Sequence, residues 1–142
     1  MRILLTVSLL VLTPALAAAS PAMQPGLYDI AMQMEMKGMP MQMPPMKFQQ
    51  CLTAKDIDEG KAYTSGDNKD CKITSFKQNG NKVSYEFNCA VEGGRRMVGQ
   101  SSGTSHASGY DIAMNGRFIP AMEGMSEFSQ KLSAKRIGAC AK

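Results

Sequence analysis

The chain has 142 residues and a formal net charge of +4 at pH 7, and 44% of its residues are hydrophobic. This composition is that of a globular domain, and so small and dispersed a positive charge argues against a nucleic-acid partner. The chain holds a single histidine, and its acidic residues form no recognisable catalytic frame. We therefore expect a protein that is not an enzyme.

The first 19 residues have the pattern of a secretory signal peptide. Arg2 supplies the positive start, residues 3–12 form the apolar centre, and the small residues at Ala17 to Ala19 provide a cleavage site. The apolar segment is too short for a membrane span, and no cysteine follows it closely enough to carry a lipid anchor. We expect export to the periplasm or secretion, without a stable membrane anchor, and a single mature domain over residues 20–142.

Methionine is concentrated in residues 27–46, which we expect to form a hairpin. Seven methionines lie between positions 32 and 46. Apolar and polar residues alternate from Leu27 to Met36, which is the period of a half-buried strand. Pro40 fits only an edge strand, because it lacks an N–H donor. A turn at Lys37-Gly38 would place Met36 opposite Met39, Met34 opposite Met41 and Met32 opposite Met43.

This methionine segment admits three interpretations. The first is apolar packing, which includes use as an adaptable surface for a hydrophobic ligand or a protein partner, made by the alternating side chains Tyr28, Ile30, Met32, Met34 and Met36. The second is binding of Cu(I) or Ag(I), which soft thioethers select, with ligands drawn from Met32, Met34, Met36, Met39, Met41 and Met43. The third is an oxidant sink, in which exposed methionines become sulfoxides that are later reduced.

A short strand and a short helix follow the methionine segment. Residues 47–52 can form a strand that contains Cys51 near its end. Thr53 and Asp56 have the spacing of a capping box at a helix start, and Gly60 is placed to end that helix. Residues 61–70 are polar and indicate a loop.

Two cysteines flank the clearest hairpin in the chain. An Asn79-Gly80-Asn81 loop would pair Lys77 with Val83, Ser75 with Tyr85, Ile73 with Phe87 and Cys71 with Cys89. This register gathers the apolar side chains on one face, with Phe76 as the exception. An even number of cysteines in an exported chain predicts disulfides. The register favours Cys71–Cys89, which leaves Cys51 for Cys140, and the two other connectivities stay open. In the loop-entropy description these bonds contribute about 3 and about 4.6 kcal/mol.

Three further strands fit residues 95–104, 110–119 and 127–137, separated by short polar turns. Many short strands with one brief helix predict a mainly β domain. We expect an antiparallel meander that forms an open barrel or half-barrel, with one short helix and two disulfides.

Other motifs in the chain are weaker. Residues 99–103 match the G-x-S-x-G string, but a nucleophile elbow needs a strand-turn-helix setting that this stretch does not predict. His106 is better interpreted as a surface residue, and the acidic cluster at Asp56, Asp58 and Glu59 lacks the spacing of a calcium loop. The chain has no C-x-x-C pair, which excludes thioredoxin-type chemistry, haem attachment and zinc ribbons.

Several short motifs follow one another along nearly the whole mature chain. They are Pro25-Gly26-Leu27-Tyr28, Met34-Glu35-Met36, Gly38-Met39-Pro40-Met41, Pro44, Cys51-Leu52-Thr53, Asp70-Cys71-Lys72, Val83-Ser84, Cys89, Arg136-Ile137-Gly138 and Cys140. In this order they resemble a bacterial exported family catalogued as domain of unknown function 3617. The resemblance implies a small periplasmic protein with this cysteine framework and methionine segment, and it implies no assigned activity.

The sequence therefore predicts an exported, non-enzymatic protein that presents a methionine-lined binding face. We expect no cofactor unless the metal interpretation holds, in which case the ion is Cu(I) or Ag(I).

Overall fold

The structure is a computed structural model that describes residues 22–39, 43–64, 70–122 and 124–141. The predicted signal peptide, together with Pro40 and Met41, lies outside these residues. The elements are β1 (Gly26–Met36), β2 (Met46–Leu52), α1 (Ala54–Asp58), the 3₁₀ turn η1 (Lys61–Tyr63), β3 (Cys71–Asn79), β4 (Lys82–Val91), the 3₁₀ turn η2 (Glu92–Gly94), β5 (Arg95–His106), β6 (Gly109–Met122) and β7 (Met125–Gly138).

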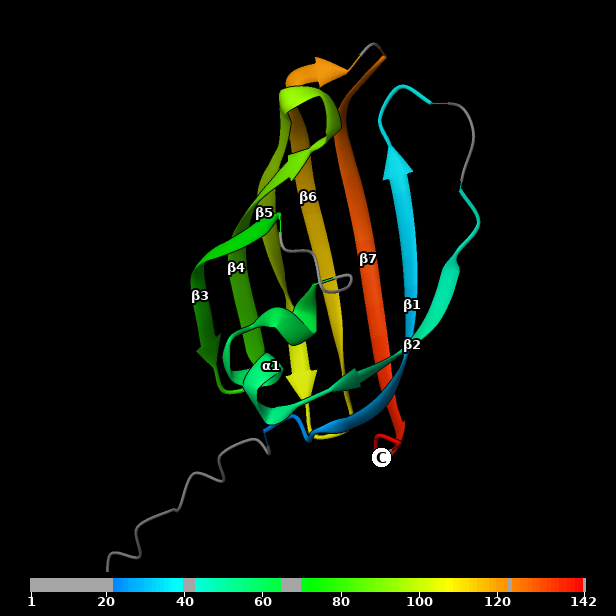
Figure 1. Cartoon of the computed structure of the whole chain (residues 1–142), viewed down its shortest axis with the longest axis vertical. Coiled ribbons are helices and arrows are strands. Elements are labelled where there is room, and N and C mark those ends of the chain that lie inside the picture. The colour runs from blue at the N-terminus through cyan, green and yellow to red at the C-terminus, as the bar shows by residue number, and fades with distance from the viewer. Residues whose placement is uncertain (1–21, 40–42, 65–69, 123, 142) are drawn as a thin grey trace, which may run out of the picture.

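Within the described residues the strands form a seven-stranded antiparallel sheet in the order β2-β1-β7-β6-β5-β4-β3. Strands β3 to β7 make a meander, and β1 then adds to the far side of β7 (Figure 1). The sheet is open, with β2 and β3 at its two edges. The predicted fold class, a mainly β open meander with a short helix and two disulfides, is confirmed.

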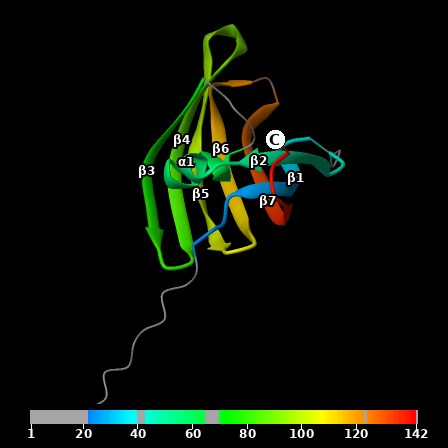
Figure 2. The ribbon, with the colours of Figure 1, turned by 60° about the horizontal axis from the view of Figure 1, so that its bottom comes forward.

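The segment between β2 and β3 connects the two edges of the sheet and therefore crosses one of its faces, which we call the inner face. Figures 1 and 2 show α1 lying against this face, beside the end of β2. The predicted capping box starts the helix: Thr53 Oγ1 accepts from the Asp56 backbone N–H, and Asp56 accepts from the Thr53 backbone N–H. Gly60 follows in the left-handed conformation, with φ of 73°. Ile57, Gly60, Ala62 and Tyr63 are buried among the described residues of this crossing.

Two glycines of the inner face lie against phenylalanine rings. Gly99 of β5 and Gly116 of β6 are directly paired. A Cβ added at Gly99 would lie 2.6 Å from Phe87 Cζ, and one at Gly116 would lie 2.7 Å from Phe128 Cε1. The two rings, whose centroids are 6.3 Å apart, therefore occupy the space that side chains at Gly99 and Gly116 would fill.

Both predicted disulfides are present. Cys71–Cys89 links directly opposed residues of β3 and β4, and Cys51–Cys140 links β2 to the segment after β7. Because β1 lies between β2 and β7 in the sheet, the second bond ties together the two strands that flank β1.

The predicted register of the β3–β4 hairpin is right at its base and wrong at its tip. Ile73 pairs with Phe87 as expected, but Lys77 pairs with Ser84, after a bulge between Thr74 and Lys77. Ser75 adopts φ of 53° in this bulge. An extra residue in the strand reverses the alternation of side chains beyond it. Phe76 can therefore face inward, where its ring stacks on Tyr63 at 6.0 Å.

The predicted register of the methionine hairpin is also wrong. Met32 pairs with Met46 instead of Met43, and the β1–β2 pairing ends there. The predicted bend at Lys37-Gly38 is present, and across it the Met39 backbone N–H donates to Met36 O at 3.3 Å. The ladder cannot continue through Pro44 and Pro45, which lack N–H donors. Met34 and Met36 instead pair only with β7, opposite Gln130 and Phe128.

Candidate functional site

The predicted ligand face of β1 is divided in two by the structure. Its five residues alternate with outward residues as expected. However, Tyr28 and Ile30 are 0% and 1% exposed, because they form part of the core under α1 and η1. Only Met32, Met34 and Met36 are half-buried and so partly accessible. Tyr28 and Ile30 therefore contribute to stability and offer no accessible surface to a ligand.

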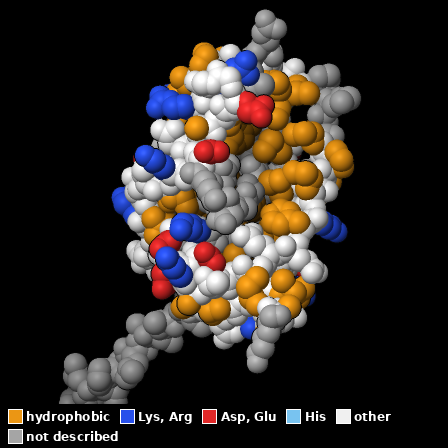
Figure 3. All heavy atoms as spheres, viewed as in Figure 1, with side chains coloured by type: hydrophobic (Ala, Val, Ile, Leu, Met, Phe, Trp, Pro, Cys, Tyr) orange, Lys and Arg blue, Asp and Glu red, His pale blue; other side chains and the backbone are white. Residues whose placement is uncertain are grey.

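The accessible part of the inner face lies over β1 and β2. Met46 and Phe48 of β2 stand on the same side as Met32, because Met46 pairs with Met32 and Phe48 with Ile30. We call Met32, Met34, Met36, Met46 and Phe48 the methionine face. Figure 3 shows hydrophobic side chains gathered in this region of the molecule. Met46 is 54% exposed, which is the highest value among the large hydrophobic side chains of the described residues.

The remaining predicted metal ligands are not brought together with this face by any strand pairing of the described residues. Met39 and Met43 are 41% and 37% exposed and lie outside the strands. Met41 is not among the described residues. Within residues 27–46 the register pairs Met32 with Met46, which was not among the predicted metal ligands.

The tyrosines of the chain gather in the part of the inner face around η1. Tyr28, Tyr63, Tyr85 and Tyr110 are each at most 2% exposed. Tyr85 donates to Tyr63 O at 2.6 Å, and Tyr63 donates to Ser105 Oγ at 3.0 Å. Burial raises the pKa of Tyr85 to about 12, and burial also raises the pKa of Tyr110. Both hydroxyl groups stay protonated at neutral pH, and that of Tyr85 acts as a fixed hydrogen-bond donor.

Four buried polar atoms of the described residues have no hydrogen-bond partner. Ser101 and Gln130 are each 4% exposed, and Tyr110 is 0% exposed. Ser101 Oγ, Tyr110 OH and Gln130 Nε2 have no hydrogen-bond partner among the described residues, and neither does Gln50 Oε1. Sequence reasoning missed this group. The available signal was the polar residue at an inward position between apolar ones, as in Phe128, Gln130 and Leu132.

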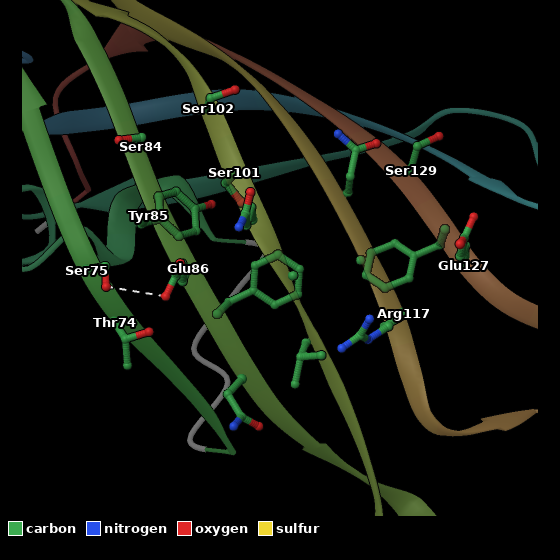
Figure 4. A pocket seen from close by; sticks show the side chains of 18 of the residues that line it. Thr74, Ser75, Ser84, Tyr85, Glu86, Ser101, Ser102, Arg117, Glu127 and Ser129 are labelled. Atoms are coloured by element: carbon green, nitrogen blue, oxygen red, sulfur yellow. Dashed lines mark hydrogen bonds between the residues drawn. The ribbon is translucent and has the colours of Figure 1, made fainter.

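A hollow of about 1190 Å³ is lined by polar outward residues of the sheet together with inward residues such as Tyr85, Phe87 and Phe128. Across its floor, the register aligns polar side chains from six strands: Glu35, Thr74, Glu86, Gln100, Asn115 and Ser129. Figure 4 shows the hydroxyl and charged side chains along β3 to β7, with the Ser75–Glu86 hydrogen bond drawn. At its rim Lys37 pairs with Glu127 at 2.8 Å. A polar outer face is usual for an antiparallel sheet that buries its other side.

The weaker sequence motifs do not assemble into a site. The G-x-S-x-G string lies inside β5, so Ser101 is not at the head of a strand-turn-helix. His106 is exposed and contacts Ser108 through Nδ1 at 3.3 Å. Among the described residues no cluster of three or more His, Cys, Asp or Glu side chains could hold a metal ion. In the same part of the chain, the helices are all too short or too polar to cross a membrane.

A family model described as protein of unknown function DUF3617 matches residues 23–140. The chain belongs to the DUF3617 family. In this DUF3617 chain the match spans every strand, both disulfides and the methionine face. Searches of curated proteins and of solved structures gave no match.

Proposed function

We propose that this DUF3617 protein is an exported, non-enzymatic binding protein that holds an apolar ligand on the methionine face. The observation that carries the proposal is the division of β1. Its inward side chains are sealed in the core at Tyr28 and Ile30 and become half-exposed methionines from Met32 onward. A strand committed only to packing would bury its inward positions along its whole length.

The chemistry of the methionine face suits an apolar ligand whose shape is not fixed. Thioether side chains are unbranched and polarizable, so they adjust to irregular apolar shapes. Met46 adds exposed apolar surface beside Met32 across the β1–β2 pair. Exposed apolar surface of this kind on a soluble domain commonly marks a binding site.

Export is supported by two independent features. The first 19 residues have the charge and hydropathy pattern of a secretory signal. All four cysteines are paired in disulfides, which persist in oxidising compartments such as the periplasm. We assign no cofactor to the proposed binding activity.

The proposal is tested by titrating the protein with N-phenyl-1-naphthylamine, a neutral fluorophore that brightens in apolar surroundings. The wild-type protein should bind it with saturation. Met34→Gln/Met36→Gln keeps the side-chain length but adds polar amides, and we expect affinity to fall at least about tenfold, because each polar group would lose its water. Ile137→Gln removes an exposed apolar side chain elsewhere on β7 and is the matched control. Absence of saturable binding by the folded wild type would contradict the proposal.

A second candidate function is binding of Cu(I) or Ag(I). It is favoured by the direct pairing of Met32 with Met46, which brings two thioethers to neighbouring positions on the same side of the sheet. Met32→Leu/Met46→Leu separates the two functions, because leucine keeps the apolar surface and removes the sulfur ligands. Loss of Cu(I) affinity with unchanged fluorophore binding would support the metal function. Competition against a Cu(I) chelator under reducing conditions measures that affinity, and no affinity in the wild type would exclude it.

A further inference from the structure

One buried amide lies directly beside the methionine face. Gln130 of β7 pairs with Met34 of β1 on one side and with Met114 of β6 on the other. Its side chain is therefore inward-facing, and the residue is 4% exposed. Gln130 Nε2 has no hydrogen-bond partner among the described residues. A buried donor without a partner is costly to a folded protein, so its retention calls for a physical explanation.

The same row of the sheet holds a second group of this kind. Met114 also pairs with Ser101 of β5, so Gln130 and Ser101 flank it on either side. Adjacent strands are about 4.8 Å apart, which puts the two backbones about 10 Å from each other. Ser101 Oγ likewise lacks a partner within the described residues. The row Met34, Gln130, Met114 and Ser101 thus continues the methionine face inward, and it reaches Tyr85 of β4, whose hydroxyl donates to Tyr63 O.

We infer that the ligand of the methionine face is a neutral acyl compound whose carbonyl oxygen accepts a hydrogen bond from Gln130 Nε2, while its hydrocarbon chain lies along the methionines. This inference rests on the proposed function and names its ligand class. An amide N–H is a donor that matches an ester or amide carbonyl. The flanking methionines, which can change rotamer easily, give a flexible chain access to the amide.

The charge distribution favours a neutral ligand over a fatty-acid anion. Gln130 lies in the row of paired residues that contains Met34, and the rows that contain Met32 and Met36 lie on either side of it. In these three rows, none of the inward residues of β1, β4, β5, β6 and β7 is charged. The nearest inward cation of β7 is Arg136, and its Nε already donates to Pro25 O at 3.0 Å. A carboxylate at Gln130 would therefore be buried without a counter-ion, which is strongly unfavourable.

The test compares three ligands of equal chain length by displacement of bound N-phenyl-1-naphthylamine: dodecane, methyl dodecanoate and dodecanoate. The quantity of interest is the ratio of the dodecane Kd to the ester Kd. In Gln130→Leu this ratio should fall about 3- to 10-fold, because the variant loses one hydrogen bond to the ester and nothing to the alkane. Gln100→Leu makes the same change at an exposed position on the outer face of β5 and should leave the ratio unchanged. Dodecanoate should bind more weakly than its methyl ester.

Each outcome decides between the inference and its alternatives. An unchanged ratio in Gln130→Leu, or tighter binding of dodecanoate than of the ester, overturns the inference while the proposed function stands. Binding of neither the fluorophore nor any competitor by the wild type overturns the proposed function itself.

The Tm of ligand-free Gln130→Leu should equal or exceed that of the wild type, because the substitution removes an unpaired buried donor. A lowered Tm would show that the amide is bonded within the protein and would overturn the inference. Gln130→Met, unbranched like glutamine, serves as a second variant.

Discussion

The two ends of the inner face share strand β1 but are built from different side chains. At the end covered by α1 and η1, the residues are tyrosines that are at most 2% exposed, and three of their hydroxyl groups donate to fixed oxygen atoms. At the other end the residues are methionines that are half-buried or exposed and make no directional bonds. One strand, β1, passes from Tyr28 to Met36 through both environments.

This difference teaches how one sheet can be rigid and adaptable at once. Aromatic rings with bonded hydroxyl groups define a single packing arrangement, since moving one ring breaks a hydrogen bond as well as contacts. Thioethers lose little when they change rotamer. We therefore expect substitutions and conditions that act on the tyrosine end to change stability, and those that act on the methionine end to change binding.

The largest effect on stability should come from the disulfide that anchors the tyrosine end. Cys51 neighbours Leu27 in the β1–β2 pair, only one residue from Tyr28. Cys51→Ala/Cys140→Ala opens a long loop, and we expect the free energy of unfolding to fall by about 4.6 kcal/mol. Urea denaturation followed by circular dichroism measures the change. A loss below about 1 kcal/mol would show that packing alone fixes this end.

The second effect is alkaline unfolding driven by the tyrosine end. Burial raises the pKa of Tyr85 from 10.0 to about 12 and also raises that of Tyr110. The unfolded chain therefore loses these protons first, so stability is intact below pH 10 and falls as the pH rises above it. For Tyr85 alone the loss amounts to about 2–3 kcal/mol once the pH exceeds both values. Absorbance at 295 nm should rise together with unfolding, whereas ionisation well before unfolding would contradict the burial of these hydroxyl groups.

A smaller effect is expected at Phe128, which pairs with Gly116 of β6 on one side and with Met36 of β1 on the other. Gly116→Ala would place a methyl group 2.7 Å from Phe128 Cε1, and such overpacking typically costs about 1–3 kcal/mol. Gly138→Ala, at the end of β7, is the control, because no atom lies within 4 Å of the added carbon. Chemical denaturation of both variants gives the comparison. Equal stability of the two would mean that the rings move aside without cost.

The smallest effect on stability should come from the methionine end. Met34→Leu changes the shape but not the size of a half-buried apolar side chain, so the free energy of unfolding should change by less than about 1.5 kcal/mol. Thermal denaturation measures it. A change as large as that of the disulfide variant would place Met34 in the rigid part of the molecule and end the contrast between the two halves.

Local patterns in the sequence were enough to predict much of the fold. The alternation in β1, the capping box at Thr53 and the opposition of Cys71 and Cys89 each depend on residues close in sequence. The errors come from long-range packing. The bulge before Lys77 lets Phe76 reach Tyr63, which arrives from the crossing segment, and Met34 pairs with β7, which lies almost a hundred residues further along the chain.

The candidate site was only partly predictable for the same reason. Strand alternation identified Met32, Met34 and Met36 as inward residues. It could not tell that Tyr28 and Ile30 would be sealed, because α1 and η1 cover them only in three dimensions. The role of Gln130 follows from its neighbours Met34 and Met114, which belong to other strands.

The central claim, an apolar ligand on the methionine face, is tested most directly by NMR of the protein labelled with ¹³C at the methionine methyl groups. Adding N-phenyl-1-naphthylamine should shift the methyl signals of Met32, Met34, Met36 and Met46, each assigned from its leucine variant. The signal of Met23, which is 4% exposed in the core at the tyrosine end, should stay in place. Shifts confined to methionines outside the methionine face, or no shifts at saturation, would contradict the account.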